Sequence, residues 1–176
     1  ACSFIADHIR IDNPHFANYA FLSDCETPRD YGNSNFFFGW FRFNELRAQF
    51  FKGNMHPNAF EPLEKAFVQA IPFNYFKKYQ WYQLAFSWDD ATKDMKLYVN
   101  GILVGSSDRF NRDFLHKRCG DTLYAGCPAL CHGKISFFDE VLSGDKIYRC
   151  YREETTAYNP ETEKLLRHHF PVRTYR

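Results

Sequence analysis

Three aspartates lie close together where a strand-like segment ends. Asp89 and Asp90 directly follow the segment 81–88, and Asp94 comes four residues after Asp90. Carboxylate oxygens are the ligands that a hard cation such as calcium takes in proteins, so the three are calcium candidates. Aspartate is also a common turn residue, because its side chain bonds to nearby backbone groups. The spacing favours a turn, and calcium is the cofactor that these three residues raise.

Catalytic groups do not form a complete pattern in this sequence. Glycoside hydrolysis needs two carboxylates at a fixed separation, and Glu61 and Glu64 instead flank Pro62-Leu63 in an irregular segment. The seven histidines give neither an H-x-x-x-H zinc motif nor a Cys/His nucleophile pattern. We therefore predict a non-enzymatic protein, with a divergent polysaccharide lyase or hydrolase as the less favoured alternative.

Six cysteines form an even set, which permits complete pairing into disulfides. In an oxidising compartment we expect two or three bridges, with at least one inside the cluster Cys119, Cys127 and Cys131. Buried free thiols in a cytosolic protein are one alternative. A zinc site that adds His132 to this cluster is another, although the spacing matches no closely spaced pair such as C-x2-C. The candidate disulfide residues are Cys2, Cys25, Cys119, Cys127, Cys131 and Cys150.

Amphipathic aromatic residues alternate with apolar ones along the central segment. Tyr82, Leu84, Phe86 and Trp88 share one face of a strand, and the residues between them share the other. If the first set packs into a core, the second set faces outward. Aromatic rings beside amides and cations suit stacking on a sugar or anchoring a protein. On the same reasoning the ligand-binding candidates are Trp40, Arg42, Trp81, Gln83, Lys96 and Tyr98.

Short strands with turn residues between them must position these side chains. Asn100-Gly101 predicts a two-residue type I′ hairpin, because both residues tolerate positive φ. Strands are expected at 3–12, 36–43, 47–52, 66–71, 81–88, 95–99, 102–104, 123–125 and 134–138. Ser143 is a plausible N-cap for a helical turn at 143–151, and Pro160 begins a second short helix that ends at His169. This pattern predicts an all-β sandwich.

Charge and hydropathy exclude two classes of partner. The net charge is +1, from 22 basic and 21 acidic residues, and lacks the basic excess of a general nucleic-acid-binding protein. No apolar run approaches the roughly 20 residues that cross a bilayer. The basic residues Arg109, Arg112, Lys117 and Arg118 belong to a charged loop. We expect neither nucleic-acid binding nor membrane insertion.

Two segments resemble the concanavalin A-like lectin/glucanase superfamily, in particular its laminin-G-like and pentraxin-like branches. One combines the strand Trp81-Tyr-Gln-Leu-Ala-Phe-Ser-Trp-Asp with the hairpin Lys96-Leu-Tyr-Val-Asn-Gly. The other is the closing strand and helix Gly133-Lys-Ile-Ser-Phe-Phe-Asp-Glu-Val-Leu-Ser-Gly-Asp-Lys-Ile. The match runs through residues 36–151 in order, and it departs from the pattern at Lys146, where those branches carry an acidic residue.

The resemblance implies a two-sheet antiparallel jelly roll of residues 1–152, followed by a C-terminal extension, 153–176, that packs on it as a short helix. Such domains are usually extracellular, bind glycans or protein partners, and often hold calcium. We therefore expect a secreted or cell-surface recognition domain that binds carbohydrate on its outer sheet face. A protein–protein adhesion or assembly module, using rim loops or the extension, is the second hypothesis.

Overall fold

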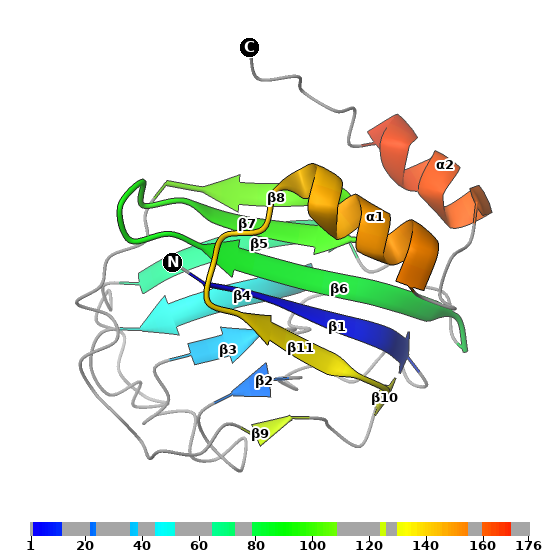
Figure 1. Ribbon diagram of the computed structural model, residues 1–176, viewed down its shortest axis with the longest axis horizontal. Coiled ribbons are helices and arrows are strands. Elements are labelled where there is room, and N and C mark those ends of the chain that lie inside the picture. Colours follow the sequence, from blue (N-terminus) through cyan, green and yellow to red (C-terminus); the bar gives the residue numbers. More distant parts are fainter. Residues whose placement is uncertain are drawn as a thin grey trace.

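The computed structural model describes residues 2–11, 22–23, 36–38, 45–51, 65–72, 79–108, 124–125, 130–154 and 160–169. These residues form mainly antiparallel β-structure in two sheets, with two helices (Figure 1). Sheet A comprises β1 (Cys2–Ile11), β6 (Trp81–Trp88), β7 (Met95–Val99), β8 (Ile102–Ser107), β10 (Leu130–His132) and β11 (Ile135–Phe138). Sheet B comprises β2 (Leu22–Ser23), β3 (Phe36–Phe38), β4 (Glu45–Phe51), β5 (Lys65–Pro72) and β9 (Tyr124–Ala125).

The strand order brings distant parts of the chain together. Sheet A runs β10-β1-β6-β7-β8, with β11 also paired to β1, and sheet B runs β5-β4-β3-β2-β9. The N-terminal strand β1 therefore lies between β6 on one side and the late strands β10 and β11 on the other. Strand β5 of sheet B contacts β7 and β8 of sheet A, and the two sheets form separate layers in Figure 1.

The hairpin between β7 and β8 has the predicted turn. Asn100 (φ 51) and Gly101 (φ 72) both take positive φ, as a type I′ turn requires. Asn100 also ties the turn to β6: its backbone N–H donates to the Gln83 carbonyl (2.9 Å), and its Oδ1 accepts from the Gln83 N–H (2.9 Å). These two bonds place the β7–β8 turn beside the start of β6.

The inner face of sheet A is a packed apolar layer. Phe4, Leu84 and Phe86 are fully buried, and the Phe4 and Phe86 rings lie 5.8 Å apart between centroids. Tyr82, Met95, Leu97 and Val99 are buried on the same side. The predicted alternation along β6 is thus confirmed for the set that packs inward, as expected for a half-buried strand.

Helix α1 (Gly144–Glu154) covers the outer face of sheet A (Figure 1). Ile147 and Leu142 pack with Ile5, Ala85 and Tyr98 in a second buried cluster. Partly buried Leu103, Phe138 and Cys150 pack against it. A sheet covered on both faces buries both sets of alternating side chains. The expectation that the outer face lies open is therefore wrong where α1 lies on it.

Local hydrogen bonds fix where α1 begins. The Ser143 hydroxyl accepts from the Lys146 N–H (3.2 Å), and the Ser143 carbonyl accepts from the Ile147 N–H (3.0 Å). This confirms Ser143 as the N-cap. Just before the cap, the Leu142 N–H donates to the Ser3 hydroxyl (2.9 Å), which is buried in β1. The entry to the helix is thereby attached to the N-terminal strand.

Helix α2 (Pro160–His169) has the predicted bounds. Arg167 lies over the Tyr148 ring of α1, with 4.9 Å from Cζ to the ring centroid, and α2 also contacts β8. Helix α1 continues to Glu154, two residues past the expected domain end at 152. Among the described residues, no helix has the length and hydropathy that a membrane span requires.

The cysteine prediction concerns mostly residues that lie outside the described part of the chain. Cys25, Cys119 and Cys127 lie there, and Cys2 and Cys131 are described only as backbone positions in β1 and β10. Cys150 is partly buried in α1 beside the second cluster. Disulfide pairing remains a prediction.

Candidate functional site

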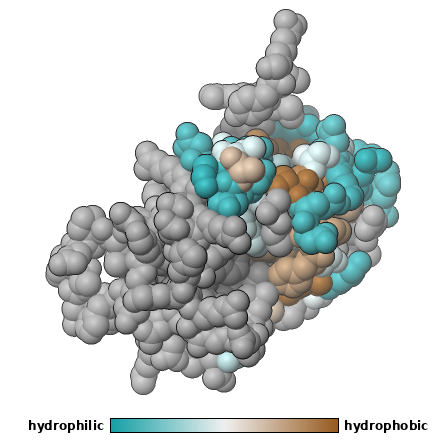
Figure 2. Space-filling model, turned by 60° about the vertical axis from the view of Figure 1, so that its left-hand side comes forward, coloured by the Kyte–Doolittle hydropathy of each residue, from teal (hydrophilic) through white to brown (hydrophobic). Residues whose placement is uncertain are grey.

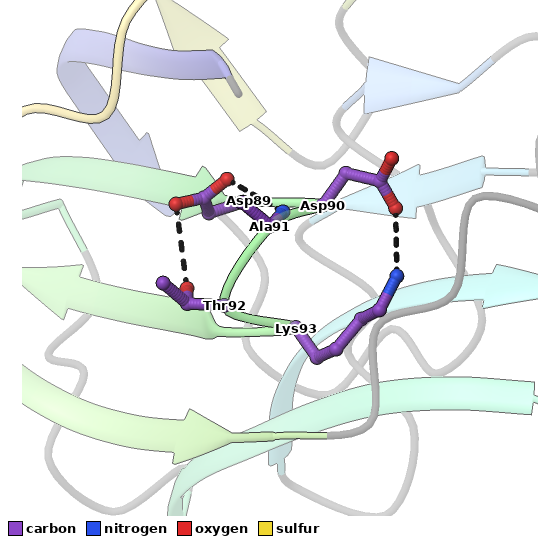
Figure 3. A network of polar contacts seen from close by, with 5 residues as sticks. All are labelled: Asp89, Asp90, Ala91, Thr92 and Lys93. Carbon is purple, nitrogen blue, oxygen red and sulfur yellow. Dashed lines mark hydrogen bonds and ion pairs between the residues drawn. The ribbon is translucent and has the colours of Figure 1, made fainter.

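The three aspartates lie in a compact turn between β6 and β7. Figure 3 shows Asp89 and Asp90 with their contacts in this turn. Asp89 accepts from the Ala91 N–H (3.0 Å) and from the Thr92 hydroxyl (3.3 Å) through its two carboxylate oxygens. Asp90 pairs with Lys93 (3.0 Å), and the Asp89 N–H donates to the Asp94 carbonyl (2.9 Å). Each aspartate therefore has a role in building or closing the turn.

These contacts favour the turn over a calcium site. Two of the three carboxylates face lysine ammonium groups, since Asp94 also lies 3.1 Å from Lys96 Nζ. A cation would have to displace both lysines. Across the described ranges, no group of three His, Cys, Asp or Glu side chains is placed to hold a metal ion. Calcium binding by this protein remains a prediction without support from Asp89, Asp90 and Asp94.

Two predicted ligand-binding residues are buried, and one of them, Tyr98, lies under α1. Gln83 is fully buried, and Tyr98 is 4% exposed. The Tyr98 ring lies under the first residue of the helix, since a Cβ on Gly144 would sit 3.6 Å from its Cε1. Burial raises the pKa of Tyr98 to about 12, against a smaller lowering by its hydrogen bond with Ser87. Gln83 and Tyr98 are therefore not on an open surface in this fold, and a role for them in ligand binding remains a prediction.

The other four predicted ligand-binding residues are either half-buried or outside the described part of the chain. Trp81 and Lys96 are half-buried, and Lys96 is paired with Asp94 at the turn. Trp40 and Arg42 lie outside the described residues, so their role remains a prediction. Trp81 is thus the predicted aromatic residue that the described structure leaves partly accessible.

An exposed tyrosine lies directly before Trp81. The Tyr79 side chain is 63% exposed, the largest value among the exposed large hydrophobic residues described. Its backbone has φ 64, a left-handed conformation that costs an L-residue roughly 1–2 kcal/mol. Strain of this kind is often kept at functional sites. We call Tyr79, Gln80 and Trp81 the β6 entry site.

The sequence analysis did not single out Tyr79. The available signal was the run Tyr79-Gln80-Trp81-Tyr82, in which amphipathic side chains gather where a strand begins. Strand ends and the loops beside them carry ligand contacts more often than the middle of a covered sheet does. The alternation within 81–88 instead indicated the face of β6 that α1 covers.

A second group of polar and aromatic side chains lies where α1 meets α2. Tyr148 in α1 is flanked by Arg152 and Arg167, whose Cζ atoms lie 5.9 Å and 4.9 Å from the ring centroid. Arg152 also donates to the Tyr148 hydroxyl (3.2 Å). Tyr148 lies directly on the hairpin, because a Cβ on Gly101 would come 2.7 Å from the Tyr148 Cα. We call Tyr148, Arg152 and Arg167 the helix cluster.

The β6 entry site and the helix cluster occupy the same end of sheet A. The Gln83–Asn100 hydrogen bonds set the start of β6 beside the turn on which Tyr148 lies. In Figure 1 both the start of β6 and the C-terminal part of α1 lie at the right-hand end. Figure 2 views the molecule from nearer the other end and shows apolar surface among hydrophilic residues. Phe137 on β11 is a further exposed aromatic residue, at 52%.

Comparisons with known proteins identify the fold but no family. No family model matches the chain, and no curated protein matches it. Among solved structures, the CBM40 module of the Ruminococcus gnavus IT-sialidase bound to α2,3-sialyllactose superposes with a TM-score of 0.59 at 15% identity. That match covers 85% of this chain and 82% of the module.

Two larger proteins contain a similar domain. The botulinum neurotoxin serotype C1 binding domain matches with a TM-score of 0.57 at 14% identity, over 88% of this chain and 37% of that one. A leech intramolecular trans-sialidase complexed with 2,7-anhydro-Neu5Ac matches with a TM-score of 0.57 at 14% identity. This match covers 90% of this chain and 24% of the trans-sialidase. The chain therefore spans about a third or less of these two proteins. At such identities the likeness shows a shared β-sandwich fold.

Proposed function

We propose that this protein is a non-enzymatic carbohydrate-recognition domain that acts outside the cell. Its sandwich is then a jelly roll of the concanavalin A-like superfamily, as the sequence motifs predict. The observation that carries the proposal is the match to the CBM40 module, because it covers nearly the whole of a module that was solved with sialyllactose. Sialylated oligosaccharides are for that reason the first ligands to test.

We place the sugar at the β6 entry site. The exposed Tyr79 ring and the half-buried Trp81 ring offer apolar faces with polar edges, which suit stacking on a pyranose ring. Gln80, which lies between them in the sequence, is half-buried and adds a side-chain amide. Trp40 and Arg42 remain proposed ligand-binding residues from the sequence. The covered face of β6 and β7 has no part in this model, because α1 excludes a ligand from it.

A glycan array with and without calcium tests the proposal. We expect binding to a set of related oligosaccharides, with sialyllactose among them, and no change when EDTA removes calcium. Tyr79→Ala and Trp81→Ala should abolish the signal, while Phe137→Ala, which removes another exposed aromatic ring, should leave it intact. An array without any bound glycan would reject the proposal, and release of free sugars from a polysaccharide panel would reject its non-enzymatic part.

Protein binding is the second candidate, and Phe137 favours it. This side chain is 52% exposed on β11, a strand that pairs only with β1 within the described residues. An edge strand presents unpaired backbone groups to which another chain can pair, and an exposed aromatic ring on it adds apolar contact area. Loss of partner binding in Phe137→Ala, with glycan binding unchanged, would separate this surface from the sugar site.

A further inference from the structure

The turn between β7 and β8 contains a chemically reactive pair of residues. Asn100-Gly101 is the only Asn-Gly pair in the sequence. Because glycine has no side chain to block the approach, its backbone nitrogen can reach the side-chain amide of the preceding asparagine. Attack at this amide closes a succinimide ring and releases ammonia. Asn-Gly is for this reason the dipeptide in which asparagine deamidates most readily.

This reaction needs only the chain itself and water. The Gly101 nitrogen forms a bond to Asn100 Cγ, the bond from Cγ to Nδ2 breaks, and the Gly101 N–H proton leaves with Nδ2 in ammonia. Water then opens the succinimide at either of its carbonyl groups. Opening at Cγ gives aspartate. Opening at the backbone carbonyl gives isoaspartate, in which the main chain runs through an additional carbon atom.

The fold holds the Asn100 side chain away from this reaction. Asn100 is fully buried, and its Oδ1 accepts from the Gln83 N–H (2.9 Å), so the amide is directed towards β6. Its own N–H donates to the Gln83 carbonyl (2.9 Å), and its φ is 51. The Oδ1 bond must break before the amide can turn towards the Gly101 nitrogen.

Helix α1 covers the attacking nitrogen. Gly101 is buried, and a Cβ on it would lie 2.7 Å from the Tyr148 Cα, so the helix backbone lies directly on the glycine. The nitrogen must lose its proton to water or hydroxide, and this burial keeps both away from it. Ile147 and Tyr151, which are fully buried, hold α1 in this position. Access to the Gly101 N–H therefore depends on movement of α1 away from the turn.

We propose that Asn100 is a modification site that deamidates when α1 moves away from the β7–β8 turn, and that isoaspartate there prevents the turn from forming again. A two-residue type I′ turn has no place for an additional backbone atom. The modified chain should therefore lose both bonds to Gln83 and the close packing of α1 on Gly101. This inference goes beyond sugar recognition and does not depend on it.

Peptide mass spectrometry measures the modification at Asn100. The protein is incubated near physiological temperature and pH, and the reference is the same protein unfolded in guanidinium chloride. Trypsin then releases the peptide that follows Lys96 and ends at Arg109. Mass distinguishes the acid from the amide in this peptide, and chromatography separates isoaspartate from aspartate.

A matched pair of variants tests the part played by α1. Ile147→Ala removes a fully buried contact of the helix, and Lys146→Ala changes the exposed residue beside it. Thermal unfolding confirms that each variant is folded at the temperature of incubation. Guanidinium concentrations below the unfolding transition of the unchanged protein open α1 without any substitution, and they replace Ile147→Ala if that variant does not fold.

We expect Asn100 to deamidate at least about tenfold more slowly in the folded protein than in the unfolded chain, because the reaction requires a local opening that is rarely populated. Ile147→Ala should raise the rate in the folded protein about tenfold or more, and Lys146→Ala should leave it unchanged. Equal rates in the folded and unfolded protein would overturn the inference. Equal rates in the two variants and the unchanged protein would also overturn it, because α1 would then not control access to the turn.

The isolated isoaspartate form tests the structural consequence. It should unfold at a lower temperature than the unmodified protein, because the turn can no longer hold the start of β6 and the end of α1 together. An isoaspartate form with the unfolding temperature of the unmodified protein would contradict this part of the inference.

Discussion

At the scale of single residues, Gly101 links the hairpin to the helix that covers it. Its φ of 72 is one that side chains disfavour, and an added Cβ would lie 2.7 Å from the Tyr148 Cα. We predict that Gly101→Ala lowers the free energy of unfolding by about 2 kcal/mol or more. Urea unfolding followed by circular dichroism measures this.

Gly144 provides the matched control for that substitution. A Cβ there would meet the Tyr98 ring at 3.6 Å, an ordinary contact, and the residue begins α1. Gly144→Ala should therefore be neutral or stabilise the protein by up to about 1 kcal/mol. Equal losses of stability in the two variants would contradict the proposed close approach of α1 to the turn.

Because the Tyr98 hydroxyl is buried, we predict that the free energy of unfolding falls at alkaline pH. Its pKa is raised to about 12 in the folded protein, from an ordinary value of 10.0, mainly by burial. The unfolded chain therefore loses this proton first, so the contribution is fully present below pH 10 and is lost as the pH rises towards 12. Between about pH 9 and about pH 11.5 the loss amounts to roughly 2 kcal/mol.

Tyr98→Phe should remove this part of the pH dependence. The variant lacks the ionisable hydroxyl and its bond to Ser87, so it begins less stable at neutral pH by about 1 kcal/mol. The unchanged protein then loses roughly 2 kcal/mol relative to the variant as the pH rises towards 12, so the two stability curves converge and then cross. Parallel curves would show that the Tyr98 hydroxyl is accessible to water, against its position under α1.

Residue-level predictions from the sequence were accurate where the cause was local. Asn100-Gly101 and Ser143 took the predicted roles, because turn and cap preferences depend on neighbouring backbone groups. Tyr98 was expected on an open face and is buried, because its surroundings include Leu142 and Ile147, which come more than forty residues later in the chain. Alternation within β6 separates its two faces but does not say what covers each face.

At the scale of elements, α1 is part of the core. Ile147 is fully buried between the helix and sheet A, whereas Lys146 beside it is exposed and pairs with Glu140 at 2.7 Å. We predict that Ile147→Ala costs about 2–4 kcal/mol of unfolding free energy. Lys146→Ala should cost less than about 1 kcal/mol, because exposed ion pairs contribute little. Chemical denaturation measures the unfolding free energy of both variants. Equal losses would mean that α1 does not bury the face of sheet A on which it lies.

The elements that the sequence predicted are those with a strong periodic pattern. Strands β6 and β7 and helix α2 have the expected bounds, and β1, β4, β5 and β11 lie within two residues of theirs. Strands β2 and β10 were missed, since two or three residues are too few to show alternation. The helical spacing of Ile147 and Tyr151 was available as a sign that α1 has a buried face.

At the scale of the whole molecule, the covering helix determines where a ligand has access. Because both faces of sheet A are buried where they are described, the ends and edges of this sheet remain for recognition. The end that carries Tyr79 and Trp81 also carries the arginines of the helix cluster, which combines stacking surface with positive charge. The chain's nearly even charge balance makes such a cluster a local feature, not a property of the whole surface.

The tryptophan indole N–H resonances test the central claim directly. The three tryptophans include Trp81 at the start of β6 and Trp88 at its far end, stacked on Phe86 at 5.4 Å. Titration with 3′-sialyllactose, followed by NMR, should shift the Trp81 indole signal in a saturable manner and leave the Trp88 signal in place. A Trp81 signal that stays unchanged while the sugar binds would contradict the account.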